Sequence, residues 1–94
     1  KEKDAWDIYF CLLSHEGGIE GLAGEFEPVL TNALVQEGLQ KIRTKFSSVD
    51  AIGPAFVADF EELTERSERQ GKQRDAFERV NRLLDHLKVT EYKP

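Results

Sequence analysis

Apolar residues recur every three or four positions in four stretches of the chain: Trp6–Leu13, Val35–Phe46, Ile52–Leu63 and Phe77–Leu87. This spacing places side chains on one face of an α-helix. No stretch shows the alternation of apolar and polar residues that is typical of a half-buried β-strand. The hydrophobic pattern therefore predicts an all-α protein.

Glycine and proline indicate where the predicted helices begin and end. Gly17-Gly18 closes the first helix, and Pro28 suits the first turn of the second. Gly53-Pro54 begins the third helix, and Gly71 caps it before the last. Four helical segments with short connections usually bury their apolar faces in a bundle. We therefore expect residues 1–94 to form a single domain, a small antiparallel or orthogonal four-helix bundle.

The first predicted helix is apolar nearly all round, so it should be the most buried of the four. It contains Cys11, the only cysteine, so no intrachain disulfide can form. The apolar neighbours of Cys11 favour a buried small hydrophobe over a reactive thiolate. A reducing, intracellular compartment, the cytoplasm, is the expected location.

Two features of the whole chain bear on its context. The longest apolar run, Ile8–Leu13, is far too short to span a bilayer, so no membrane segment is expected. The chain has no methionine and begins with lysine. We therefore expect it to be a domain excised from a longer protein.

The segment EGGIEGLAGEFE, residues 16–27, is rich in glycine and glutamate. Glycine loses more chain entropy on ordering than other residues do, which favours a loop or a frayed helical turn. We predict a mobile segment that docks on a basic partner. The candidate contact residues are Glu16, Glu20, Glu25, Phe26 and Glu27.

Charge is unevenly distributed along the chain. Residues 1–40 carry two lysines against eight acidic residues, and the whole chain has a net charge of −5, so the remaining residues are net +1. The acidic first part disfavours nonspecific binding to nucleic acid or to anionic lipid. A locally basic patch in the second part is still compatible with these numbers.

The last predicted helix carries a row of polar side chains opposite its apolar face. At 100° per residue, the four members fall within about 60° of arc. Acid-before-base spacing of four predicts that Asp75 pairs with Arg79 and that Glu78 pairs with Arg82 on a solvated face. The row is also the candidate surface site, and it comprises Asp75, Arg79, Arg82 and His86.

Arg79 and His86 have six residues between them. This spacing resembles the pattern of arginine, four to six residues, and histidine in the HEPN family of helical RNases. The resemblance covers eight residues, and Val80 stands where that family usually has a polar residue. In the family, the two residues meet across a dimer and cleave RNA without a metal, the imidazole moving a proton and the guanidinium stabilising the phosphate. The resemblance implies that Arg79, Arg82 and His86 act on RNA.

Other chemistry has little support in the sequence. With two histidines and one cysteine, a zinc site would need mostly carboxylate ligands, and no serine has a glycine-flanked elbow. We expect no cofactor. The main hypothesis is a non-catalytic helical protein-interaction or regulatory domain of a larger intracellular protein or complex, with another protein or a second copy as partner. The alternative is a nucleic-acid-acting domain, either a HEPN-like RNase or an accessory domain of a DNA or RNA enzyme, and a small-ligand site in the core is a third possibility.

Overall fold

The structure, a computed structural model, describes residues 2–89, with side chains from residue 6 onward. Within this range there is no β-strand, so the predicted all-α class is confirmed. The chain forms five α-helices rather than the four expected, together with one short 3₁₀ helix. These elements are α1 (Glu2–Ser14), α2 (Gly18–Phe26), η1 (Glu27–Val29), α3 (Ala33–Lys45), α4 (Ile52–Phe60) and α5 (Arg66–His86).

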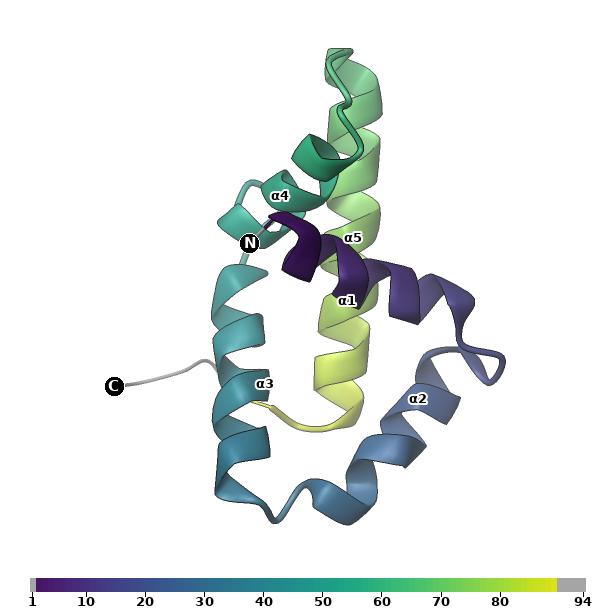
Figure 1. The fold of residues 1–94 in the computed structure, drawn as a ribbon, viewed down its shortest axis with the longest axis vertical. Coiled ribbons are helices and arrows are strands. Elements are labelled where there is room, and N and C mark those ends of the chain that lie inside the picture. Colours follow the sequence, from purple (N-terminus) through teal and green to yellow (C-terminus); the bar gives the residue numbers. More distant parts are fainter. Residues whose placement is uncertain (1, 90–94) are drawn as a thin grey trace.

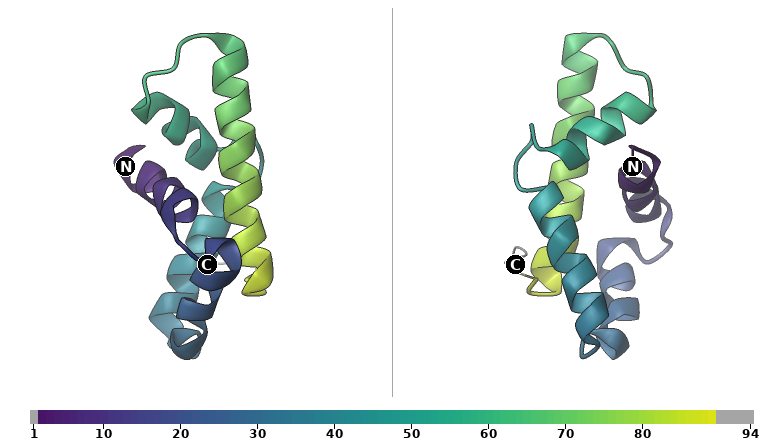
Figure 2. Two further views of the ribbon diagram at one scale, coloured as in Figure 1. Left: turned by 90° about the vertical axis from the view of Figure 1, so that its right-hand side faces the viewer. Right: turned by 60° about the vertical axis from the view of Figure 1, so that its left-hand side comes forward.

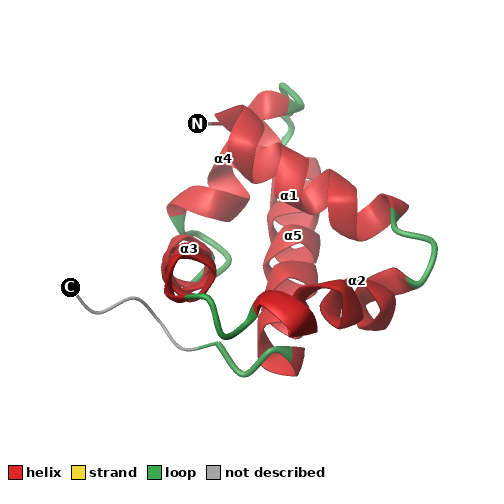
Figure 3. Ribbon diagram, turned by 60° about the horizontal axis from the view of Figure 1, so that its bottom comes forward, coloured by secondary structure: helices red, strands yellow, loops and turns green. Residues whose placement is uncertain are grey.

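The longest helix, α5, is the support on which the others lie. Figure 1 shows α1 crossing α5, with α4 near its upper half and α2 and α3 beside its lower half. Figure 2 shows α5 running along one side of the molecule. Figure 3 shows the other four helices arranged around it. Among residues 2–89, no helix combines the length and the apolar character needed to cross a membrane.

The apolar stripe predicted for the last helix forms the centre of the core. Ala76, Val80 and Leu84 of α5 are completely buried, while Leu83 and Leu87 are nearly so. Polar bonds fix α3 beside this stripe, because the Asn81 amide donates to the Phe46 carbonyl at 2.8 Å. The stripe therefore orders helices that are too short to be stable alone.

The predicted boundary at Gly71 is wrong, since Gly71 lies inside α5. The chain turns earlier, at Glu62, which has a φ of 58° and ends α4. The Leu63 amide bonds to the Ala58 carbonyl at 3.1 Å, as in a Schellman cap. The acid-before-base spacing of four also predicts that Glu62 pairs with Arg66 and that Glu65 pairs with Arg69. Neither pair forms within residues 2–89, because both acids lie in the turn before α5.

The charged residues of this turn have other partners. Glu65 caps the start of α5 by accepting from the backbone amides of Ser67 and Glu68. These bonds and the Ser67 hydroxyl lower the pKa of the Glu65 carboxyl. Arg69 instead pairs with Asp59 of α4 at 2.8 Å. The turn is therefore bonded to both of the helices that it joins.

Most of the glycine-rich segment forms helix α2 (Gly18–Phe26), a regular helix rather than the predicted loop or frayed helical turn. The turn before α2 uses Gly18, whose φ of 67° suits glycine. A Cβ on Gly21 would lie 3.1 Å from the His15 ring, and one on Gly17 would lie 2.9 Å from the Gly21 Cα. The glycines thus provide space for His15 to pack on α2, and the His15 Nε2–Glu25 bond of 2.7 Å holds it there.

Helix α1 is less buried than predicted. Tyr9 and Leu12 face the core, but Phe10 is 49% exposed, Leu13 is 46% exposed, and Cys11 is exposed rather than buried. The physical reason is that α1 lies across α5 and α4 and packs through one side only. An apolar side chain on the opposite side of α1 therefore faces solvent.

The buried faces of the two middle helices differ in how well they were predicted. In α3 the expected face is correct, with Leu39 and Phe46 buried, although the helix begins at Ala33 and not at Pro28. In α4 the predicted face is only partly correct, because Phe56 packs against the core but Ile52 and Phe60 are exposed. The core face of α4 consists of Gly53, Pro54, Val57 and Ala58.

Gly53 allows α4 to approach Phe46 closely. A Cβ at this position would lie 2.6 Å from Phe46 Cε1 and 2.8 Å from the Lys45 carbonyl oxygen. Gly38 and Gly71 differ, because they lie inside helices and a Cβ added at either position would have no neighbouring atom within 4 Å. Only Gly53 of these three is therefore required by packing.

We predict that Gly53→Ala lowers the free energy of unfolding by about 1–3 kcal/mol because of overpacking. Gly38→Ala and Gly71→Ala should each raise it by about 0.5–1 kcal/mol because alanine favours the helix. Urea denaturation followed by circular dichroism measures all three. A Gly53→Ala variant as stable as the wild type would contradict the packing of α4 on Phe46.

Candidate functional site

Within the predicted row on α5, Asp75 bonds to another helix. Its carboxylate accepts hydrogen bonds from the Tyr9 hydroxyl of α1 and from Arg79 Nε, the latter at 3.0 Å. Tyr9 is only 2% exposed. Burial raises the pKa of the Tyr9 phenol, and the hydrogen bond to Asp75 and its charge raise it further. Asp75 therefore anchors α1 to α5, and only the predicted Asp75–Arg79 pair of the row is confirmed.

The other three members of the row face a hollow between α5 and the turn that joins α1 to α2. We name this hollow the Arg/His cleft. Its volume is about 400 Å³. It is lined by Leu12, Leu13, His15, Gly17, Gly18, Ile19, Glu20, Arg79, Arg82 and His86.

The two walls of the Arg/His cleft carry opposite charge. Arg79 and Arg82 lie on the α5 wall, and Glu20 lies on the α2 wall. Arg79 is partly neutralised by Asp75. Arg82 is exposed and forms no ion pair within residues 2–89, so the expected bond from Glu78 is absent there. Arg82 is therefore the cation that is free to meet a ligand.

The two histidines of the cleft differ in whether their ring nitrogens already have hydrogen-bond partners. The Gly17 amide donates to His15 Nδ1 at 3.1 Å, and His15 Nε2 lies 2.7 Å from Glu25. Nδ1 must accept, so Nε2 carries the proton and both ring nitrogens are occupied. His86 is exposed and makes no hydrogen bond within residues 2–89. Of these two side chains, His86 is therefore the one whose ring nitrogens have no partner among the described residues.

The structure separates the predicted docking residues of the acidic segment. Glu20 lines the Arg/His cleft, and Glu25 is bonded to His15. Glu16 and Glu27 are exposed at the two ends of α2. Phe26 is half-buried on the other side of α2. The four glutamates are exposed, whereas Phe26 is half-buried, so a contact of the whole segment with a basic partner stays a prediction.

Phe26 lines a second hollow, which we name the apolar basin. Its volume is about 270 Å³, and helices α1, α2, α3 and α5 all contribute to it. Apart from Asp7 and Cys11 of α1, every lining side chain is a hydrocarbon. The lining consists of Asp7, Ile8, Cys11, Leu12, Leu22, Phe26, Leu39, Ile42, Val80, Leu83 and Leu84.

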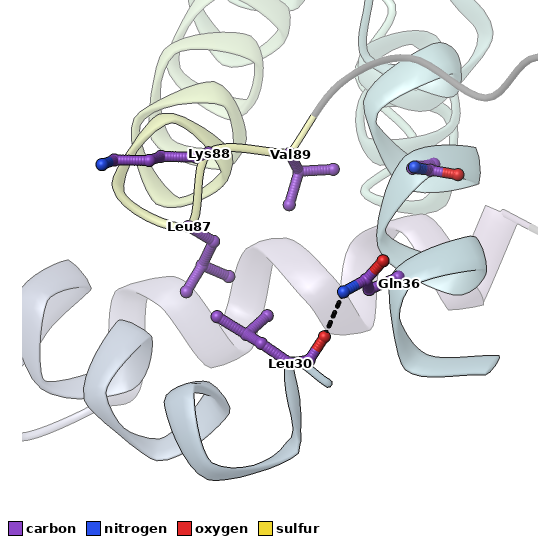
Figure 4. Close-up of a pocket in the computed structure, with 6 residues that line it drawn as sticks. Leu30, Gln36, Leu87, Lys88 and Val89 are labelled. Carbon is purple, nitrogen blue, oxygen red and sulfur yellow. Dashed lines mark hydrogen bonds between the residues drawn. The ribbon is translucent and has the colours of Figure 1, made fainter. Parts of the chain in front are cut away.

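A third hollow, of about 250 Å³, lies where the chain leaves α5. Figure 4 shows the Gln36 side chain donating to the Leu30 carbonyl across it, while the Lys88 side chain points away. Its only titratable lining residue is Lys88. The Gln36–Leu30 bond therefore links the start of α3 to the segment before it.

Within residues 2–89, no three histidine, cysteine, aspartate or glutamate side chains converge where they could hold a metal ion. Comparison of the chain with protein-family models, with curated proteins and with solved structures gives no match. Only the geometry and chemistry of the described residues therefore bear on the function.

Sequence reasoning missed the contribution of His15 and Ile19 to the Arg/His cleft. Both come from a part of the chain about sixty residues before the arginines, and only tertiary packing brings them together. The one local signal was the Gly17-Gly18 pair, which indicates a turn immediately after His15.

The Tyr9–Asp75 bond predicts a specific pH dependence. Because the folded-state pKa of Tyr9 is raised, its contribution to stability is complete below the ordinary tyrosine pKa of about 10 and is lost as the pH rises further. Tyr9→Phe should cost about 1 kcal/mol at neutral pH and remove that alkaline loss. Urea denaturation across this pH range measures both effects.

The variant Asp75→Asn is the matched control for the charge. It retains Tyr9 but removes the carboxylate, so phenolate absorbance should appear at lower pH than in the wild type. Identical titrations of the two proteins would show that Asp75 does not act on Tyr9.

Proposed function

We propose that this chain is a non-catalytic protein-interaction or regulatory domain of a larger intracellular protein or complex, and that the partner binds at the Arg/His cleft. One observation carries the proposal: Arg82 and Glu20 line opposite walls of a hollow whose floor is apolar. Such a surface complements a segment of a partner protein that carries an apolar side chain between an acidic residue and a basic residue.

The floor of the cleft supplies the apolar contact. Leu12, Leu13 and Ile19 line it. A partner carboxylate that pairs with Arg82 beside this floor would be partly desolvated, which strengthens the bond. A partner lysine or arginine would meet Glu20 on the other wall. Charge pattern and apolar fit together would thus select the partner.

The exposed part of α1 extends the proposed contact beyond the cleft. A stable protein interface needs about 800 Å² on each partner, more than a small cleft offers. Leu13 lines the cleft and is 46% exposed, and Phe10 on the same helix is 49% exposed. Trp6 stacks on Phe10 with their ring centroids 5.0 Å apart. Aromatic side chains of this kind are enriched at protein interfaces.

A second candidate is an RNA-acting domain. The observation in its favour is that Arg79, Arg82 and His86 line one cleft. The HEPN resemblance implies that the same residues of a second copy would face them across a dimer. Glu20 on the opposite wall and the exposed Glu16 nearby repel a polyanion. A protein partner with one carboxylate meets less repulsion than RNA, so the protein-interaction function is favoured.

The first test uses three labelled helical peptides with the same leucines and with acidic, basic or mixed charged residues. Fluorescence anisotropy should show the tightest binding for the mixed peptide. Arg82→Glu should weaken that binding at least about tenfold, since a charge-assisted bond contributes about 1.5–3 kcal/mol. Arg74→Glu is the matched control, because Arg74 is exposed on α5 but does not line the cleft.

A charge swap makes this test more specific. A peptide with lysine in place of its acid should recover affinity for Arg82→Glu. No saturable binding by any peptide, or equal losses in Arg82→Glu and Arg74→Glu, would contradict the proposed site.

The second test addresses RNA. Labelled RNA incubated with the wild type at low salt should remain intact if the protein-interaction function is correct. Cleavage that disappears in His86→Ala would establish the RNA-acting candidate instead. Cleavage that survives in His86→Ala would exclude this cleft as its source.

A further inference from the structure

We propose that the apolar basin binds a compact, uncharged, apolar small molecule. This inference does not rest on the proposed function, because the two hollows share only Leu12 among their lining residues. Helix α2 stands between them: Ile19 and Glu20 line the Arg/His cleft, while Leu22 and Phe26 line the apolar basin. One site can therefore be altered without the other.

The lining of the basin sets the chemistry of its ligand. Its floor contains Val80 and Leu84 of α5, and Leu22, Leu39 and Ile42 belong to its walls. A buried water needs two to four polar partners, and hydrocarbon walls offer none. An apolar molecule that fills the basin would release poorly bonded water and cover exposed hydrocarbon.

The size and shape of the basin favour a small molecule over a helix. A cavity of about 150 Å³ in another protein accepts benzene, and drug-sized sites begin near 300 Å³. The basin of about 270 Å³ therefore suits a molecule of one or two rings. A helix is about 10–12 Å across with its side chains and needs an open groove. One turn of a helix of that width occupies more space than the basin of about 270 Å³ offers.

The walls of the basin are held in place before any ligand binds. The His15–Glu25 bond holds α2 against the end of α1. On the other side, Arg43 of α3 pairs with Asp85 of α5 at 2.6 Å. The floor residues Val80 and Leu84 are completely buried core residues. A preformed hollow of this kind loses little entropy when it binds a rigid ligand.

The reactivity of the Cys11 thiol can show whether a ligand occupies the apolar basin. Cys11 is the only cysteine, it is exposed, and it lines the basin. A molecule in the basin should shield its thiol from alkylation. Because every other reactive thiol is absent from the chain, the rate of alkylation reports this position alone.

The experiment uses the neutral two-ring fluorescent probe 1-naphthylamine. Its fluorescence should rise and saturate with one probe per chain. At a probe concentration about ten times the dissociation constant, alkylation of Cys11 by iodoacetamide should slow by about tenfold, because only about a tenth of the basins stay empty. Non-saturable fluorescence, or an unchanged rate of alkylation, would overturn the proposal.

A blocking variant and a matched control complete the test. Ile42→Phe adds volume inside the basin and should weaken probe binding at least tenfold while the circular dichroism spectrum stays helical. Leu34→Phe makes the same kind of change at an exposed position of α3 that does not line the basin, and it should bind like the wild type. Equal binding by both variants would overturn the proposal.

The same assay separates a small-molecule site from a contact between copies. If a second copy of the chain covers the basin, Cys11 without the probe should react more slowly as the protein concentration rises. Light scattering would then show a dimer, and the proposed ligand would be wrong. A rate independent of protein concentration supports an open basin.

Discussion

Burial of one stripe of α5 is the interaction on which the rest of the structure depends. Val80 and Leu84, at its centre, are completely buried. Helices α2 and α4 have nine residues each and contain glycine or proline, so neither would be stable alone. They are helical because each packs against α5. The hollows follow from the same arrangement, since they lie where short helices diverge from a long one.

Polar bonds determine where the short helices lie along this stripe. Tyr9 of α1 bonds to Asp75, and the Asn81 amide donates to the Phe46 carbonyl at the end of α3. The Gln73 amide donates to the Val49 carbonyl at 3.1 Å before α4 begins. Apolar burial is not directional, whereas these bonds require particular atoms to meet. Among the described side chains, no buried nitrogen or oxygen lacks a partner.

The sequence predicted the fold best where a residue pattern is compatible with a single local structure. The stripe of α5 and the buried face of α3 follow directly from helical spacing. Helix α2 could not be predicted, because glycine disfavours a helix in isolation. Its glycines are explained only by the packing of the His15 ring on Gly21, which the sequence does not show. The prediction for α4 was partly wrong because Gly53, which has no side chain, packs closely on Phe46. The larger side chains of Ile52 and Phe60 are therefore left exposed.

The same distinction applies to the candidate site. Spacing on one helix was enough to predict that Arg79, Arg82 and His86 share a face, and the cleft brings them together. What lies opposite them, His15 and Glu20, depends on packing between distant segments. The apolar basin could not be predicted from the sequence either, because four helices line it and each contributes ordinary core residues.

The central claim is that one long helix supports two separate hollows with different chemistry. Amide chemical-shift mapping by NMR tests it most directly, with the mixed-charge peptide and the neutral probe added in turn. We expect the peptide to shift amides of residues 13–20, and the probe to shift those of residues 22–26 and 39–42, because each of these ranges lines one hollow only. Shifts in all three ranges with a single ligand, or no saturable shift with either ligand, would contradict it.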